Sequence, residues 1–270
     1  MNVIVRIDDV NFDSKVEIPD AKKASNCVIY LELRLRMVHF DGNSFVHKGK
    51  TYRTQPWPPG EWNVFRFRFK HICEHWWSHQ FWLRSPTSFN EMNLPLGNPT
   101  HRPNFQCKLR IELLPKDTDR RHARITVIRL ADDEDDLRSN SHLYDNRDIQ
   151  VSYSDDHPHI TAVHEVGHLL SLEHPGVRNR VPACLRDGNA EECYEPLGEA
   201  MGGGLGMIPD YANPWVQRLA RHTHTKPADW TVFRHAIDPV SLSRERLMRD
   251  IVDGAQRRMR DRLIQSVEGL

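Results

Sequence analysis

The sequence predicts an α+β fold, with a mixed sheet and a long helix in the first half of the chain and a shorter helix after it. Strands are indicated where apolar and polar residues alternate, most cleanly in FQCKLRIELL at 105–114. A long helix is indicated after Glu61, where aromatic and apolar residues recur at steps of three and four. A shorter helix is indicated at about 158–170, and 270 residues can enclose all these elements in one domain.

The first strands precede the long helix. We expect an edge strand at 2–10, a polar loop at 11–26, and a longer strand at 27–40 with one buried and one wetter face. A hairpin or loop follows over 41–55, with the dipeptide DG as its turn signal. The helix that begins near Glu61 is expected to bury its aromatic face in the core rather than present it to a ligand. That face comprises Trp62, Phe65, Phe69, Ile72 and Trp76.

The later elements are shorter. Strands at 105–114 and 122–130 are expected to pair as a hairpin around a polar turn. A last short strand is expected at 148–153 and a helix at 213–223. A long helical region is expected from Asp238 to the C-terminus.

Charge and hydropathy exclude several classes of partner. Lys and Arg number 37 and Asp and Glu number 37, so no general attraction to nucleic acid or membrane is expected. The acidic run at 132–136 lacks the spaced ligands of a calcium loop and is expected to be a solvated turn. No apolar run reaches the roughly 18 residues of a membrane span, and the first residues lack the pattern of a signal peptide. The sequence therefore predicts a soluble protein without membrane insertion or an ordinary signal peptide.

The stretch HEVGHLLSLEH at 164–174 carries the residues of a zinc site. On a helix, His164 and His168 stand one turn apart on one face, so their imidazole nitrogens can converge on one metal ion. Glu165 lies beside them, where a carboxylate can accept a proton from a water on the metal. Zinc lowers the pKa of such a water toward neutrality. These residue types at this spacing predict a hydrolytic site with one catalytic zinc ion.

His174 is the expected third protein ligand. If the helix continued, His174 would lie about 9 Å along and roughly 240° around the axis from His168, too far to share the metal. The chain must therefore turn between these two histidines. Ser171 is the expected turning point, because a Pro-Gly pair stops any helix directly after His174.

These residues resemble the metzincin signature HExxHxxGxxH, which implies His164, His168 and His174 as zinc ligands and Glu165 as general base. The chain departs from the signature at Ser171, where metzincins carry the glycine of a left-handed turn. A residue with a Cβ costs on the order of 1 kcal/mol in that conformation.

The metzincin resemblance also implies a methionine-containing turn beneath the zinc ion. Met201, in the run GEAMGGG, is the expected methionine, and Met207 is a weaker choice. Tyr211, shortly after this turn, is the nominated oxyanion stabiliser.

The resemblance further implies a domain organisation and a substrate. A single catalytic domain is expected over 1–270. Its upper lobe, 1–174, would hold the sheet and the active-site helix, and its lower lobe, 175–270, would hold the Met turn and the C-terminal helices. The expected partner is a peptide or protein substrate, bound beside an edge strand at 137–144 or 148–153.

The chain also resembles, more weakly, metallopeptidase toxin domains of bacterial type VI secretion effectors. That resemblance implies secretion by a non-Sec route, action in the periplasm of a target cell, and a secretion machinery or an immunity protein as partner. Cys184 and Cys193 flank a short polar loop that suits a disulfide in an oxidising compartment, with two reduced thiols as the alternative. The other cysteines, Cys27, Cys73 and Cys107, are expected to be buried small hydrophobes.

Several alternatives stay open at this stage. The motif can occur on a surface helix without metal, and a gluzincin-like site would take its third ligand from a downstream glutamate, Glu191, Glu192 or Glu199. A zinc-stabilised binding protein is a second functional class, although a structural zinc site normally has four protein ligands. A hydrolase of a non-peptide amide, such as a peptidoglycan cross-link, would use the same chemistry. Two further histidines, His157 and His159, are expected to be surface or capping residues rather than ligands.

Overall fold

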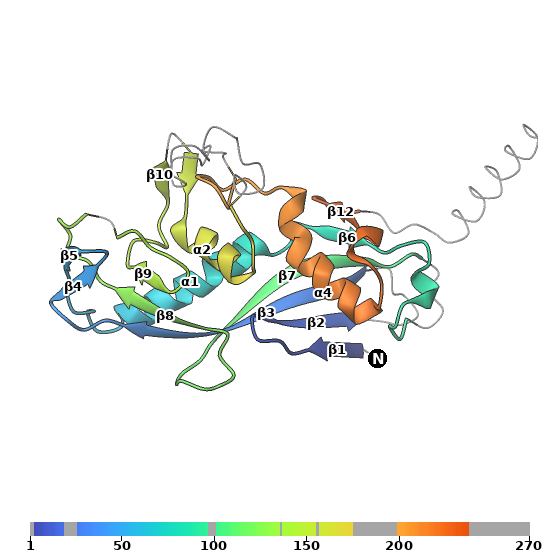
Figure 1. Ribbon diagram of the computed structural model, residues 1–270, viewed down its shortest axis with the longest axis horizontal. Helices are drawn as coiled ribbons and strands as arrows, with labels where there is room; N and C mark the ends of the chain where they lie inside the picture. Colours follow the sequence, from blue (N-terminus) through green and yellow to red (C-terminus); the bar gives the residue numbers. More distant parts are fainter. Residues whose placement is uncertain are drawn as a thin grey trace, which may run out of the picture.

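The computed structural model describes residues 3–18, 26–96, 101–135, 137–154, 157–174 and 199–237. It has a mixed α+β architecture around one eight-stranded sheet with both parallel and antiparallel pairs. The described helices α1 (Glu61–Trp77), α2 (Thr161–Leu169) and α4 (Asn213–Thr223) lie over one face of this sheet (Figure 1). The predicted α+β class is confirmed. Within the described ranges, no helix is long and apolar enough to cross a membrane.

Strand β3 (Asn26–His39) runs through the centre of the sheet. Its odd-numbered residues from Cys27 to Met37 are at most 1% exposed and share one core with the helices. Its other face carries Tyr30 and Glu32, which contact Lys15, Arg6 and Arg110 of other strands of the sheet. The predicted division into one buried and one wetter face is therefore confirmed.

The other strands flank β3 in the order β1-β2-β3-β7-β6-β12, with β8 and β9 extending from the C-terminal part of β3. Their bounds are β1 (Val3–Ile7), β2 (Asp13–Ile18), β6 (Trp82–Arg84), β7 (Asn104–Leu113), β8 (Ala123–Ile128), β9 (Leu143–Asp145) and β12 (Thr231–Phe233).

The polar loop predicted at 11–26 is wrong, because this segment contains β2. Val16 and Ile18 are fully buried, and Asp13 is fully buried in an ion pair with Arg34 of β3. Polar residues that resemble a loop locally can form a strand when a neighbouring strand supplies their partners.

The hairpin predicted from 105–114 and 122–130 is also wrong. Strand β7 pairs in parallel with residues 26–35 of β3, and β8 pairs in parallel with residues 35–39 of the same strand. Alternation identifies the buried face of a strand but does not specify which strand lies beside it.

Two antiparallel hairpins lie outside the main sheet. Strands β4 (Ser44–His47) and β5 (Lys50–Arg53) form the hairpin expected in 41–55, but its turn is at Lys48 and Gly49, which both have positive φ, rather than at the DG dipeptide. Strands β10 (Ser152–Ser154) and β11 (His157–His159) form the second. Helix α2 consequently begins at Thr161, later than the sequence predicts.

Several other predictions concern local segments. The helix predicted at 213–223 is confirmed as α4. In the described part of the acidic run, Asp133 and Asp135 are exposed and pair with Arg53 and Lys50 of β5. The helical region expected from Asp238, and the lower-lobe segment that contains Cys184 and Cys193, lie outside the described residues.

Helix α1 connects the sheet to the other two helices. Its Trp77 is fully buried, donates its indole N–H to the Val163 carbonyl of α2 at 3.0 Å, and stacks on Trp215 of α4 with ring centroids 6.4 Å apart. Strand β12 pairs with β6, so the described chain after residue 199 packs on the same sheet as the first half. The boundary between two lobes stays a prediction.

Candidate metal centre

Helix α2 and the turn after it bring His164, His168 and His174 together. The ring centroid of His164 lies 4.9 Å from that of His168 and 4.9 Å from that of His174, and the last two centroids are 4.6 Å apart. Each ring offers one nitrogen such that all three nitrogens lie within 4.8 Å of one another. These histidines form a group that could hold a metal ion.

Ser171 lies just after α2 and turns the chain back toward the helix. Its φ is 65°, in the left-handed region, as the sequence predicts for the turning point. The backbone N–H of Leu172 donates to the Gly167 carbonyl at 3.0 Å, and that of Ser171 donates to the His168 carbonyl at 2.9 Å. This pair of bonds is a Schellman motif, which satisfies the last carbonyls of the helix. The motif allows His174 to reach the other two histidines within six residues of His168.

Backbone carbonyls orient the histidine rings. The Nδ1 of His164 lies 3.0 Å from the Ala200 carbonyl, and the Nδ1 of His168 lies 2.9 Å from the Leu172 carbonyl. A carbonyl can only accept, so both Nδ1 atoms carry a proton, and in the neutral imidazoles both Nε2 atoms present a lone pair. His174 is likewise hydrogen-bonded to the Met201 backbone.

The donor set fits a metal ion. The Nε2 atoms of His168 and His174 lie only 3.0 Å apart, and a shared cation stabilises lone pairs at such a distance. Burial, followed by the neighbouring histidines, lowers the pKa of His164 to about 3 and also lowers the pKa of His174. Neutral imidazoles are the form that binds metal. His164 and His174 are therefore in the metal-binding form at neutral pH.

Glu165 is the carboxylate next to this cluster. It is 8% exposed, and burial raises the pKa of its carboxyl group to about 7. Tyr144 of β9 is fully buried, and the pKa of its phenol is raised by burial and then by the charge of Glu165. A carboxylate with a pKa near neutrality can both accept and return a proton.

Residues 199–206 form a turn that packs against α2 through Met201, which we call the Met turn. The Ala200 N–H donates to the Gly206 carbonyl at 2.7 Å, and the Gly204 N–H donates to the Glu199 carbonyl at 3.0 Å. Met201 is fully buried, and a Cβ added to Gly167 of α2 would lie 2.1 Å from its Sδ. Met201 thus lies directly against the helix turn between the two helical histidines. Met207, the weaker choice, is also buried.

Tyr211 stabilises the Met turn through two hydrogen bonds. Its hydroxyl donates to Glu199 Oε2 at 2.9 Å and accepts the Met201 backbone N–H at 3.4 Å. These bonds engage the hydroxyl within the turn, and its nomination as oxyanion stabiliser stays a prediction. Glu199 is engaged by Tyr211 and is not part of the histidine group. The other candidate glutamates, Glu191 and Glu192, lie outside the described residues.

His159 and Tyr144 lie near the site, and the sequence did not predict their positions there. His157 is exposed, as predicted, but His159 is half-buried, with its ring centroid 5.6 Å from that of His164 and a hydrogen bond to the Gly204 backbone. Strand β11 places His159 just before the N-terminal end of α2, and it is not part of the histidine group, as the sequence predicts. Tyr144 carries no local signal at all. Cys27, Cys73 and Cys107 are free and buried, which confirms their predicted packing role.

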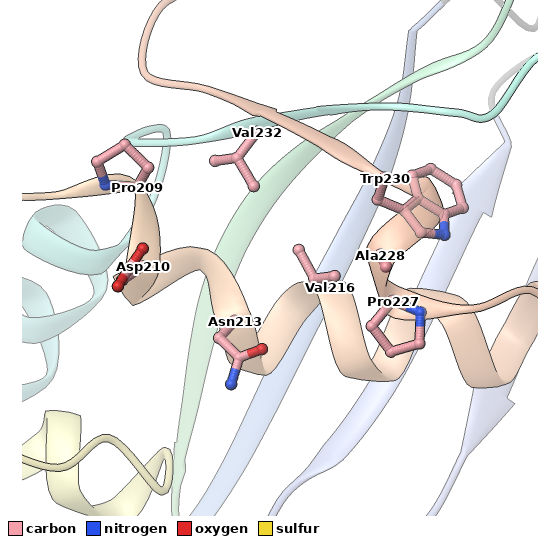
Figure 2. Close-up of a pocket in the computed structure, with 8 residues that line it drawn as sticks. All are labelled: Pro209, Asp210, Asn213, Val216, Pro227, Ala228, Trp230 and Val232. Atoms are coloured by element: carbon pink, nitrogen blue, oxygen red, sulfur yellow. The ribbon is translucent and has the colours of Figure 1, made fainter. Parts of the chain in front are cut away.

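A cavity of about 400 Å³ beside α4 is separate from the histidine cluster. Figure 2 shows its apolar lining by Val216, Trp230 and Val232, with Asp210 and Asn213 at one side. None of the three histidines lines this cavity, so it does not extend the candidate site.

Comparison of the chain with protein-family models, with curated proteins and with solved structures finds no match.

Proposed function

We propose that this protein is a zinc-dependent metallopeptidase of metzincin type, with the histidine cluster as its zinc site. The observation that carries the proposal is the convergence of His164, His168 and His174 across a left-handed turn at Ser171. A chance HExxH on a surface helix has no reason to bring a third imidazole to the same point. The buried methionine against α2 is a second, independent feature that metzincins share.

Three nitrogen ligands favour a catalytic role. A structural zinc site normally has four protein ligands, whereas three leave one position for water or substrate. Among the described residues, the group comprises these three histidines and no fourth side chain. This donor set argues against the alternative of a zinc-stabilised binding protein.

In the proposed reaction, Glu165 transfers the proton and two backbone carbonyls orient the histidine ligands. A bound zinc ion supplies Lewis acidity, which lowers the pKa of water and polarises a carbonyl group. Glu165 accepts the proton of the attacking water and passes it to the leaving amine, a transfer that its pKa of about 7 suits. The backbone carbonyls of Ala200 and Leu172 hold two of the histidines in the tautomer that binds metal.

The proposal is tested with Glu165→Gln and His174→Ala beside the wild type. Zinc content by elemental analysis and cleavage of an unbiased peptide library are measured on each. Glu165→Gln should retain one zinc ion and lose cleavage by about a hundredfold or more, because only the proton acceptor is removed. His174→Ala should lose zinc.

Glu173→Gln is the matched control, since Glu173 is an exposed glutamate in the same segment. It should retain both zinc and cleavage. If Glu165→Gln kept full turnover, Glu165 would not be the general base. If His174→Ala kept its zinc ion, the third ligand would instead be a downstream glutamate. One zinc ion in the wild type without peptide cleavage would redirect the search to non-peptide amides.

A further inference from the structure

A second pocket lies behind the turn at Ser171. Its volume is about 270 Å³, and it is bounded by the β1–β2 connection, by one face of α4, and by Leu170 and Ser171 at the end of α2. The α4 residues that line it include Gln217, Arg218 and Arg221, which share a helix face by their spacing.

The pocket carries an excess of positive charge. Arg218 and Arg221 both donate to the same oxygen, Asp9 Oδ2, at 2.5 and 2.8 Å. Asp9 is the one acidic residue among those that line the pocket, so two guanidinium groups face a single carboxylate. The charges of the two arginines also act on His222. Burial, and then the charges of Arg218 and Arg221, lowers the pKa of His222 to about 4. One further negative charge would balance the pocket.

The guanidinium groups are preorganised. Arg218 is 6% exposed and lies over the Phe12 ring, 4.3 Å from its centroid, which fixes the plane of the guanidinium. A guanidinium has five N–H donors, and the bonds to Asp9 use one nitrogen of each arginine. The N-terminal end of α4, at Asn213 and Pro214, also borders the pocket and favours an anion there.

The pocket and the metal centre share the Ser171 turn. The Leu172 carbonyl, one residue after Ser171, accepts a hydrogen bond from the Nδ1–H of His168. A ligand that rests on Ser171 therefore restrains the segment that orients a metal ligand.

We propose that this pocket binds a carboxylate group between Arg218 and Arg221, and that its occupancy strengthens metal binding through the Ser171 turn. A carboxylate carries the single charge that balances the pocket, and its two oxygens match the planar fork of a guanidinium. The carboxylate can come from a small organic acid or from a peptide. Carboxylate binding at this pocket goes beyond the proposed peptidase function and does not depend on catalysis.

The binding is tested by NMR titration of the zinc-loaded protein with sodium acetate, against sodium chloride at equal ionic strength. Acetate should cause saturable shifts of backbone amides near Asp9 and Arg221. Arg221→Gln should weaken this binding about tenfold, the effect of losing one charge-assisted hydrogen bond. Arg68→Gln, an exposed arginine on α1, is the matched control and should bind acetate as the wild type does.

Asn11→Asp provides a variant that leaves both arginines in place. Asn11 lines the pocket and is exposed, so the near-isosteric change adds a negative charge without altering the fold, and it should also weaken acetate binding. Shifts that persist in both variants and disappear when zinc is removed would assign the acetate to the metal ion and overturn the pocket.

Two further probes identify the group and its source. N-acetyl-dialanine should bind as the free acid and not as the C-terminal amide; equal binding of both would overturn carboxylate recognition. Tighter binding of the free-acid peptide than of acetate would indicate a peptide source, and equal binding would indicate a small organic acid.

The coupling between the pocket and the zinc site is measured by competition for zinc with a chelator. Acetate should tighten zinc binding severalfold in the wild type but not in Arg221→Gln, and an unchanged affinity in both would overturn the coupling.

Discussion

Met201 packs against Gly167, so we predict that Gly167→Ala destabilises the wild type but stabilises the Met201→Ala variant. In the wild type, Gly167→Ala places a Cβ 2.1 Å from Met201 Sδ and 3.0 Å from Trp77 Cζ2. Both neighbours are fully buried, so neither can move aside without disturbing the core. Overpacking of this kind costs about 1–3 kcal/mol, and a clash with two fixed neighbours belongs near the upper end.

Helix propensity acts in the opposite direction. Gly167 is inside α2, where alanine is favoured over glycine by about 1 kcal/mol. Gly167→Ala should therefore destabilise the wild type by about 1–2 kcal/mol. Once Met201→Ala has removed the thioether, the same substitution should stabilise the protein by up to about 1 kcal/mol. The coupling energy between the two sites is then about 2–3 kcal/mol, as expected for residues in direct contact.

The assay is urea denaturation of the metal-free wild type, both single variants and the double variant. A change in midpoint at constant m-value reports the free energy of unfolding. Removal of metal separates packing from any effect on metal affinity. If Gly167→Ala stabilised the wild type as much as it stabilises Met201→Ala, Met201 would not lie against α2, and the assignment of the Met turn would fail.

Three further predictions concern the turn, acid stability and the metal. Ser171→Val should destabilise the protein by about 1–2 kcal/mol in thermal denaturation, whereas Ser171→Gly should not, because only the former is strained at a φ of 65°; equal effects would mean that the strain is absent. The side chain of His122 is 2% exposed. Its Nδ1 accepts a hydrogen bond from the Arg34 backbone N–H at 2.8 Å, and its Nε2 lies 3.4 Å from Asp13 Oδ1. Burial, and then the charge of Arg34, lowers the pKa of His122 to about 4. Its stabilisation is therefore present above pH 6.5 and should be lost, by up to about 3 kcal/mol, as the pH falls toward 4. His122→Asn keeps an acceptor without titrating, and its unfolding free energy should fall less over this pH range; identical pH profiles would contradict this assignment. A chelator should lower the Tm of the wild type but not that of His174→Ala, since metal at a hundred times its Kd stabilises by about 2.7 kcal/mol; an unaffected wild type would argue against a metal site.

The candidate site was predictable where it depends on spacing within one segment. His164 and His168 lie one helical turn apart, and the need for His174 to join them required a break that the chain makes at Ser171. Met201 was expected only through the metzincin resemblance, and Tyr211 was expected in a different role. Their contacts with Gly167 and Glu199 depend on how the chain returns to α2, which spacing within one segment does not specify.

The sequence by itself determined the secondary elements that periodicity encodes, such as the 213–223 helix and the buried face of β3, because these follow from repeats of a few residues. Only the tertiary structure decided that β7 and β8 both pair with β3, that 11–26 contains a strand, and that His159 lies beside His164. The physical reason is that strand pairing and burial of polar groups depend on partners distant in the chain. A local pattern records which side of an element is buried, but not what buries it.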